Sequence, residues 1–175
     1  TWAILPPQTE ELGTVEEFLA GMKRHAVKAL RAFPTPHRYL LNGTTFGPLF
    51  EEMRARRIPL IVPGDWPMVE GLLRDFPDLT VIANQLSNHG QDRYFRPLIE
   101  RYPRFYVDTT RYECDGGIAA FCRKYGPERM LFGSGFPDIP FFGGVLTLMH
   151  ADIPDGAKEA IAGGNLRRLL EEVAL

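Results

Sequence analysis

The chain has 175 residues and a formal net charge of −2, and 45% of its residues are hydrophobic and 24% charged. These values are typical of one globular domain spanning residues 1–175, and the near-neutral charge argues against binding to nucleic acid or a membrane surface, which usually requires a basic patch. No apolar run approaches the roughly 20 residues that cross a membrane, and Cys114 and Cys122 lack the spacing of a zinc or redox motif, so we expect a reduced, cytoplasmic protein.

The first part of the chain alternates apolar runs with amphipathic segments. Residues 2–5 form an apolar run that predicts a strand. Thr14, with Glu17 three residues later, is typical of a capping box and predicts that a helix begins there. A second strand is expected at residues 29–33 and a second helix at residues 46–57.

The same alternation continues to the end of the chain. Further strands are expected at residues 59–62, 79–83, 105–107 and 130–132, and further helices at residues 68–76, 94–102, 118–125, 144–150 and 157–173. Six strand–helix repeats, with strands apolar on both faces, predict an α/β fold built on a parallel sheet. Periodicity leaves two arrangements open, a doubly wound sheet and a (β/α)8 barrel. No G-x-G-x-x-G motif or P-loop follows a strand, so the usual evidence for a nucleotide-binding doubly wound domain is missing.

Five segments carry a further signal, namely residues 58–62, 76–83, 102–110, 125–134 and 164–170. In this order and spacing they resemble the amidohydrolase-related family of the amidohydrolase superfamily, which includes metal-dependent hydrolases, aromatic-acid decarboxylases and lactonases. The resemblance covers roughly residues 45–175 and implies a TIM-type (β/α)8 barrel, of which this chain would form strands three to eight. The first two βα units would then be missing, since a full barrel needs about 250 residues.

The resemblance also implies where a metal would bind. In the family, an H-x-H pair on the first strand, a His at the end of the fifth and of the sixth strand, and an Asp in a Gly-Ser-Asp turn after the eighth hold the ion. Here Pro63 follows the fifth strand, Asn84 or Gln85 ends the sixth, and Gly135 stands in the turn. Zinc and similar ions need three or four N, O or S ligands. The sequence therefore predicts no cofactor, and a divalent metal would require ligands from sequence outside this chain.

Barrel active sites lie at the carboxyl ends of the strands, which selects a set of polar residues. Asp65, His89 and Glu113 are the candidates for proton transfer. Each has a structural alternative, because Asp65 can cap a helix, His89 can be an exposed loop residue and Glu113 can belong to a solvated ion pair. Asp108 is expected to be structural, held by neighbouring hydroxyl groups. The candidates for substrate binding are Arg31, Trp66, Asn84, Gln85, Arg111, Tyr112 and Ser134.

Two classes of function follow from this reasoning. The first is an amidohydrolase-related hydrolase, or a lactonase or decarboxylase-type lyase, acting on a small carboxylate or aromatic substrate without the family's metal. The alternative is a non-catalytic ligand-binding or structural relative, because a shared fold does not establish a shared activity. We expect a small-molecule substrate and neither nucleic acid nor a membrane as partner. Since six units of a barrel leave two sheet edges exposed, we also expect an open barrel, self-association or a missing N-terminal segment.

Overall fold

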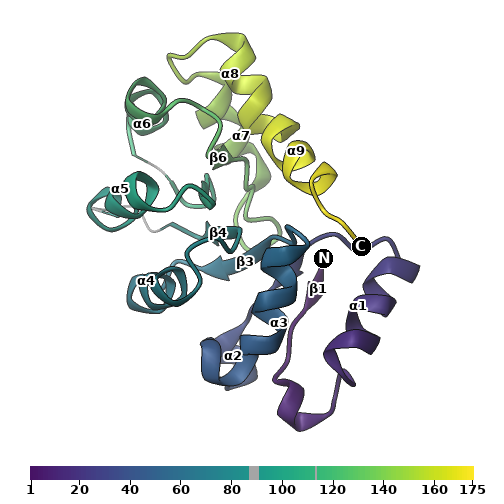
Figure 1. Ribbon diagram of the computed structural model, residues 1–175. Helices are drawn as coiled ribbons and strands as arrows, with labels where there is room; N and C mark the ends of the chain where they lie inside the picture. Colours follow the sequence, from purple (N-terminus) through teal and green to yellow (C-terminus); the bar gives the residue numbers. More distant parts are fainter. Residues whose placement is uncertain (87–90, 113) are drawn as a thin grey trace.

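The computed structural model describes residues 1–86, 91–112 and 114–175. Six strands form one sheet, which lies at the centre with the helices around it (Figure 1). The strands are β1 (Trp2–Ala3), β2 (Leu30–Arg31), β3 (Leu60–Pro63), β4 (Val81–Asn84), β5 (Phe105–Asp108) and β6 (Met130–Leu131). All neighbouring strands are parallel and the order in the sheet is β1-β2-β3-β4-β5-β6. A doubly wound sheet reverses its strand order at a switch point, so this sequential order identifies six βα units of a TIM-type barrel.

The helices connect successive strands and close the chain. They are α1 (Val15–Arg24), α2 (Pro34–His37), α3 (Gly43–Ala55), α4 (Trp66–Asp75), α5 (Asp92–Arg101), α6 (Gly117–Tyr125), α7 (Phe141–Met149), α8 (Asp155–Glu159) and α9 (Asn165–Glu171), with a 3-10 turn η1 at Pro7–Thr9 and a π-helical turn η2 at Ala160–Gly164. None of the helices in the described residues is long and apolar enough to cross a membrane.

Side-chain caps determine where several helices begin. The Thr14 hydroxyl accepts a hydrogen bond from the Glu17 N–H at 3.2 Å and the Glu17 carboxylate accepts one from the Thr14 N–H at 2.9 Å, which confirms the capping box of α1. The Asn42 side chain caps α3 through the Thr45 N–H. That helix therefore begins three residues before the predicted residue 46. The prediction placed its start at the first apolar residue of the pattern and did not recognise Asn42 as the cap.

The C-terminal helical region differs most from the prediction. The helix expected over residues 157–173, with a possible break at Gly163-Gly164, is divided into α8, the π-helical turn η2, which contains both glycines, and α9. The preceding helix begins at Phe141, directly after Pro140, and not at residue 144. A short helix, α2, and the turn η1 were not predicted, since both contain prolines in segments without apolar periodicity.

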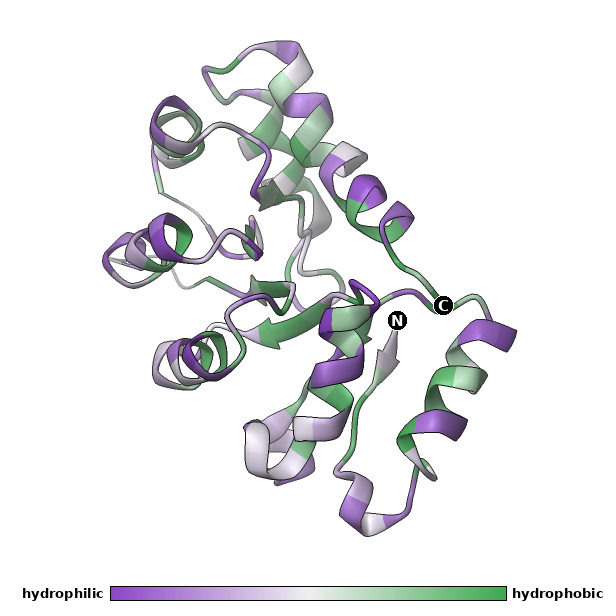
Figure 2. Cartoon of the chain, viewed as in Figure 1, coloured by the Kyte–Doolittle hydropathy of each residue, from purple (hydrophilic) through white to green (hydrophobic). Residues whose placement is uncertain are grey.

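The two faces of the sheet have different coverings. One face packs against the amphipathic helices, whose hydrophobic sides turn towards the strands in Figure 2. This outer face includes Leu30, Leu60, Val81, Phe105 and Met130. Residues of the opposite, inner face alternate with these along each strand. Ile61, Ile82, Tyr106 and Leu131 form a small apolar cluster there, closed by Leu169 of α9.

Helix α9 lies across the amino ends of the strands. Arg104, just before β5, pairs with Glu172 at 2.8 Å, and the Lys28 ammonium, before β2, donates to the Leu170 carbonyl at 3.0 Å. Figure 1 shows α9 on the side of the strands opposite α4 and α5. These contacts hold Leu169 against the inner face. The C-terminal helix therefore covers the interior of the incomplete barrel at the amino ends of the strands.

The sheet stays open, and its two edges are unequal. Within the described residues β1 and β6 do not pair with each other. On the outer edge of β6, the Phe132 N–H donates to the Ile161 carbonyl at 2.9 Å, and the Asn165 amide donates to the Met130 carbonyl at 2.9 Å. These two backbone groups of the β6 edge are thus satisfied by η2 and α9. An open barrel was one of the arrangements expected; self-association stays a prediction.

Candidate functional site

Polar side chains gather on the inner face at the carboxyl ends of β2 to β5. Register pairs Pro63 with Asn84 on neighbouring strands. Alternation along β4 places Ile82 and Asn84 on the inner face and Ala83 on the outer one. Asn84 is buried, whereas Gln85 is exposed and has a left-handed backbone with φ of 58°. The structure therefore decides the alternative that the sequence left open: Asn84 occupies the interior position that ends this strand.

Arg31 reaches the buried amide of Asn84 from β2. With the amide oriented so that both its atoms are paired, its oxygen accepts from Arg31 Nη2 at 2.7 Å and its nitrogen donates to the Val62 carbonyl at 3.0 Å. The guanidinium also lies 4.9 Å from the centre of the Phe33 ring. Arg31 is thus held in place by an amide and an aromatic ring.

Asp108 ends β5 on the same face and is the titratable centre of the cluster. Its carboxylate accepts hydrogen bonds from the Thr110 N–H at 3.0 Å and from the Thr110 hydroxyl at 2.9 Å. Burial raises the pKa of the Asp108 carboxyl to about 6, while the Thr110 bonds, the backbone of Gln85 and the charge of Arg31 act to lower it. The side chain keeps some exposed surface. A carboxyl with this pKa can take up and release a proton near neutral pH.

Gly133, after β6, allows the neighbouring chain segments to come close to Asp108. A Cβ at this position would lie 2.5 Å from Asp108 Oδ2 and 2.1 Å from the Thr110 hydroxyl oxygen. The Thr109 hydroxyl accepts from the Gly133 N–H at 3.1 Å and donates to the Gly133 carbonyl at 3.3 Å. This glycine is therefore required by the close packing of the β5 and β6 ends.

The metal positions of the resemblance can be tested against this geometry. Pro63 and Asn84 lie side by side at the ends of β3 and β4, and Gly135 follows β6 with φ of 70°. Pro63 and Gly135 carry no ligand atom on their side chains, and an amide is a weak substitute for an imidazole. In the described ranges no group of three or more His, Cys, Asp or Glu side chains comes together. The donor set at these positions does not fit the family's metal.

Two of the residues predicted from the sequence have structural roles at α4. The Asp65 carboxylate accepts from the Met68 N–H at 3.2 Å and caps the helix, which was its structural alternative. Trp66 is buried, stacks on Tyr94 at 5.9 Å between ring centres, and donates its indole N–H to the Gln91 side chain. A role in proton transfer or substrate binding stays a prediction for both.

Tyr112 is also engaged within the protein. Its hydroxyl donates to Asp92 Oδ1 at 2.9 Å, and Arg96 Nε donates to the same oxygen at 2.9 Å. Burial, followed by the hydrogen bond and negative charge of Asp92, raises the pKa of Tyr112. The hydroxyl is therefore bound to α5, and the side chain is buried where it lines a pocket at the end of β5.

Arg111 and Ser134 come together in a pocket of about 220 Å³ between the ends of β5 and β6 and the start of α7. Arg111 is exposed and its backbone is left-handed, with φ of 59°. The Ser134 hydroxyl oxygen accepts from the Phe136 N–H at 3.3 Å. These two predicted binding residues thus share one cavity next to the Asp108 cluster, as neighbouring strand ends imply.

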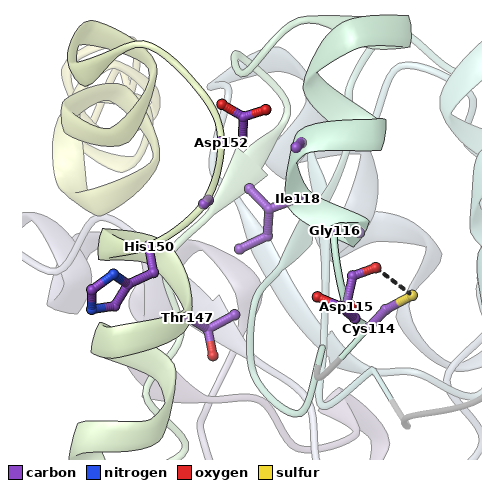
Figure 3. A pocket seen from close by; sticks show the side chains of 10 residues that line it. Cys114, Asp115, Gly116, Ile118, Thr147, His150 and Asp152 are labelled. Atoms are coloured by element: carbon purple, nitrogen blue, oxygen red, sulfur yellow. Dashed lines mark hydrogen bonds between the residues drawn. The ribbon is translucent and has the colours of Figure 1, made fainter.

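A larger pocket, of about 450 Å³, is drawn in Figure 3, and Thr147 lines both this pocket and the pocket of Arg111. It is bordered by the segment that leads into α6 and by the end of α7. The His150 ring points away from it, and Cys114 is engaged with the Asp115 carbonyl at 3.9 Å. Among the described residues, the side chains of Cys114, His150 and Asp152 that line this pocket form no hydrogen bond or ion pair with one another.

His89 and Glu113, two of the three candidates for proton transfer, lie outside the described residues. Asp108, which was expected to be structural, has a raised pKa that the sequence did not indicate. Its hydrogen bonds from Thr110 agree with that expectation, but its nearness to Arg31 across three strands was not foreseen. The signal in the sequence that could have indicated this nearness was the position of Asp108 at the end of a strand, on the face that points to the interior.

Comparison with known proteins agrees with this fold. A family model described as Amidohydrolase matches residues 1–171. No curated protein shows a significant match. Among solved structures, an uncharacterized TIM-barrel protein from Bordetella bronchiseptica is 22% identical, with a TM-score of 0.68 over 91% of this chain and 64% of that chain.

Two enzymes of known name are also similar in fold. 5-Carboxyvanillate decarboxylase from Sphingomonas paucimobilis is 18% identical, with a TM-score of 0.62 over 91% of this chain and 64% of its own. 2,6-Dihydroxybenzoate decarboxylase from Rhizobium is 13% identical, with a TM-score of 0.66 over 97% of this chain and 69% of its own. The chain thus spans 64% of the length of the first two structures. With the family model covering residues 1–171, this chain belongs to the amidohydrolase family.

Proposed function

We propose that the chain carries the acid–base part of an enzyme site that acts on a small aromatic carboxylate, with Asp108 as the group that transfers the proton. The observation that carries the proposal is the position of this carboxyl. It lies on the inner face at the carboxyl end of β5, with a pKa of about 6. Active sites of this fold lie at that end of the strands, and a general acid works best when its pKa is near the working pH.

Arg31 and Asn84 complete the site by fixing charge and orientation. The amide of Asn84 holds the guanidinium of Arg31 at 2.7 Å. The positive charge lowers the pKa of Asp108 and partly offsets the effect of burial. Both protonation states of Asp108 are therefore populated near neutral pH, which a residue that must give and regain a proton requires.

Decarboxylation is the reaction class that these groups fit best. The protonated Asp108 gives its proton to the ring carbon that bears the carboxylate. The bond between that carbon and the carboxylate then breaks, its electron pair stays with the ring, and carbon dioxide leaves. Asp108 regains a proton from solvent. This series of steps needs one proton donor and no activated water. Two proteins of similar fold are decarboxylases of aromatic acids.

The test is turnover of a panel of hydroxylated benzoates, followed by carbon dioxide release, with lactones and dihydroorotate as hydrolysis substrates. Asp108→Asn should lower the rate about 100-fold or more, as loss of a general acid does. The wild-type rate should fall as pH rises through about 6, because the protonated form is the active one. Asp155→Asn, an exposed carboxylate on α8, is the matched control. Decarboxylation that survives Asp108→Asn undiminished rules out the assigned role.

A non-catalytic relative remains the second candidate, and one observation favours it. Pro63 and Gly135 provide no side-chain donor where the family holds its metal. Binding of the panel compounds without turnover by the wild-type chain would support this alternative over the enzyme.

A further inference from the structure

We propose that the pocket between β5, β6 and α7 binds the carboxylate of the substrate, with Arg111 as the residue that recognises it. This inference deepens the proposed function, since it assigns the part of the same site that takes the negatively charged group. The pocket has a volume of about 220 Å³, which is small for a ligand site and fits a single-ring acid better than a nucleotide.

The positive charge at the wall of this pocket favours an anionic ligand. Arg111 is the one charged residue among the described residues that line the pocket, and none of them is acidic. Within the described part of the chain, Arg111 forms no ion pair, in contrast to Arg96 and Arg104, which are bound by Asp92 and Glu172. A guanidinium at the wall of a cavity that has no carboxylate partner in residues 1–86, 91–112 and 114–175 favours an anion there, and guanidinium groups bind carboxylates through two parallel hydrogen bonds.

The pocket also lies next to the titratable carboxyl group of Asp108. Gly133 lines the pocket and also lies against Asp108, because a Cβ on it would approach Asp108 Oδ2 to 2.5 Å. Asp108 and Arg111 lie at and just after the end of the same strand, β5. An acid whose carboxylate sits against Arg111 would therefore have its ring near the Gly133 side of the pocket, towards Asp108.

The walls of the pocket suit a ring. Ile139 and the glycines at 143 and 144 form an apolar side. The two glycines keep α7 free of side chains where it faces the pocket. A Cβ at Gly144 would lie 3.6 Å from the Gly133 carbonyl oxygen, which is ordinary contact. A larger side chain at residue 144 would fill this space without removing any charge.

Binding of benzoate to the full chain, measured by isothermal titration calorimetry with neutral benzamide as the comparison, tests the inference. Benzoate should bind better than benzamide. Arg111→Met should weaken benzoate binding about tenfold or more and leave benzamide unchanged, since only the charge-assisted contact is lost. Gly144→Leu should weaken both by filling the pocket.

The controls repeat each change elsewhere. Arg123→Met removes an exposed arginine of α6, and Gly156→Leu adds the same side chain to α8, where a Cβ meets nothing within 4 Å. Equal binding of benzoate and benzamide, or wild-type affinity in either pocket variant, overturns the inference. If Gly144→Leu does not fold, Arg111→Met decides alone, because Arg111 is exposed and outside the core.

Turnover separates this result from the proposed function. Decarboxylation that depends on Asp108 but is indifferent to Arg111 and Gly144 leaves the function standing and removes the pocket. Benzoate binding that depends on Arg111, with no turnover of any panel compound, does the opposite.

Discussion

Replacing Asp108 by Asn should change how the stability of the protein depends on pH. The pKa of Asp108 rises from its ordinary 3.8 to about 6 in the folded protein, chiefly through burial. The folded state therefore holds the proton more tightly than the unfolded chain. Below about pH 4 the residue is protonated in both states and costs nothing. As pH rises from about 4 to about 6 the wild type loses stability, and above that range the loss is complete.

The size of the effect follows from the shift. About two pH units correspond to about 3 kcal/mol, and the remaining exposed surface of the side chain reduces this to about 2 kcal/mol. Asparagine cannot ionise. The free energy of unfolding of the wild type, minus that of Asp108→Asn, should thus fall by about 2 kcal/mol between pH 4 and pH 7.

Urea unfolding followed by tryptophan fluorescence from pH 4 to pH 8 measures this difference. All other carboxyl groups titrate alike in the two proteins, so their contributions cancel. Asp155→Asn should give a difference that hardly depends on pH, because that side chain is 96% exposed. A flat difference for Asp108→Asn, or one that grows with pH, would refute the reasoning from burial.

Three further changes test the fold. Thr14→Ala removes the cap of α1 and should lower the free energy of unfolding by about 1 kcal/mol, and an unchanged urea midpoint would contradict the capping box. Asn165→Ala leaves the Met130 carbonyl without its donor, whereas the Pro127 carbonyl keeps the Met130 N–H, and should cost about 1–3 kcal/mol in the same measurement; a smaller loss would mean that water replaces the amide. Leu169→Ala should cost about 2–5 kcal/mol, whereas Leu166→Ala, which is 37% exposed, should cost far less; equal losses would argue against α9 as the cover of the inner face.

The order of the elements was predictable from local signals. Apolar runs identified the positions of the six strands, because strands that are covered on both faces leave a continuous hydrophobic pattern. The capping box at Thr14 and the Asp65 cap of α4 were readable for the same reason, since a cap depends on residues three apart in the chain. The resemblance to the amidohydrolase family was likewise carried by short segments, and the family model confirms it.

The candidate site could be predicted only in part from local signals in the sequence. Strand ends selected Arg31 and Asn84, which contact each other in the structure, but Gln85 stood beside Asn84 as an equal alternative. A shift of one residue moves a side chain to the other face of a sheet. Register decides it, and register depends on pairing with strands distant in sequence, here on the pairing of Asn84 with Pro63.

By itself the sequence thus determined an α/β chain of six repeats and the absence of the family's ligands at Pro63 and Gly135. Only the tertiary structure decided that Asp108 of β5 lies close to Arg31 of β2, with β3 and β4 between them in the sheet. It also decided that burial raises the pKa of Asp108. It also placed α9 across the amino ends of the strands, with Leu169 against the inner face. Both outcomes depend on desolvation and on long-range packing, which no local pattern of residues encodes.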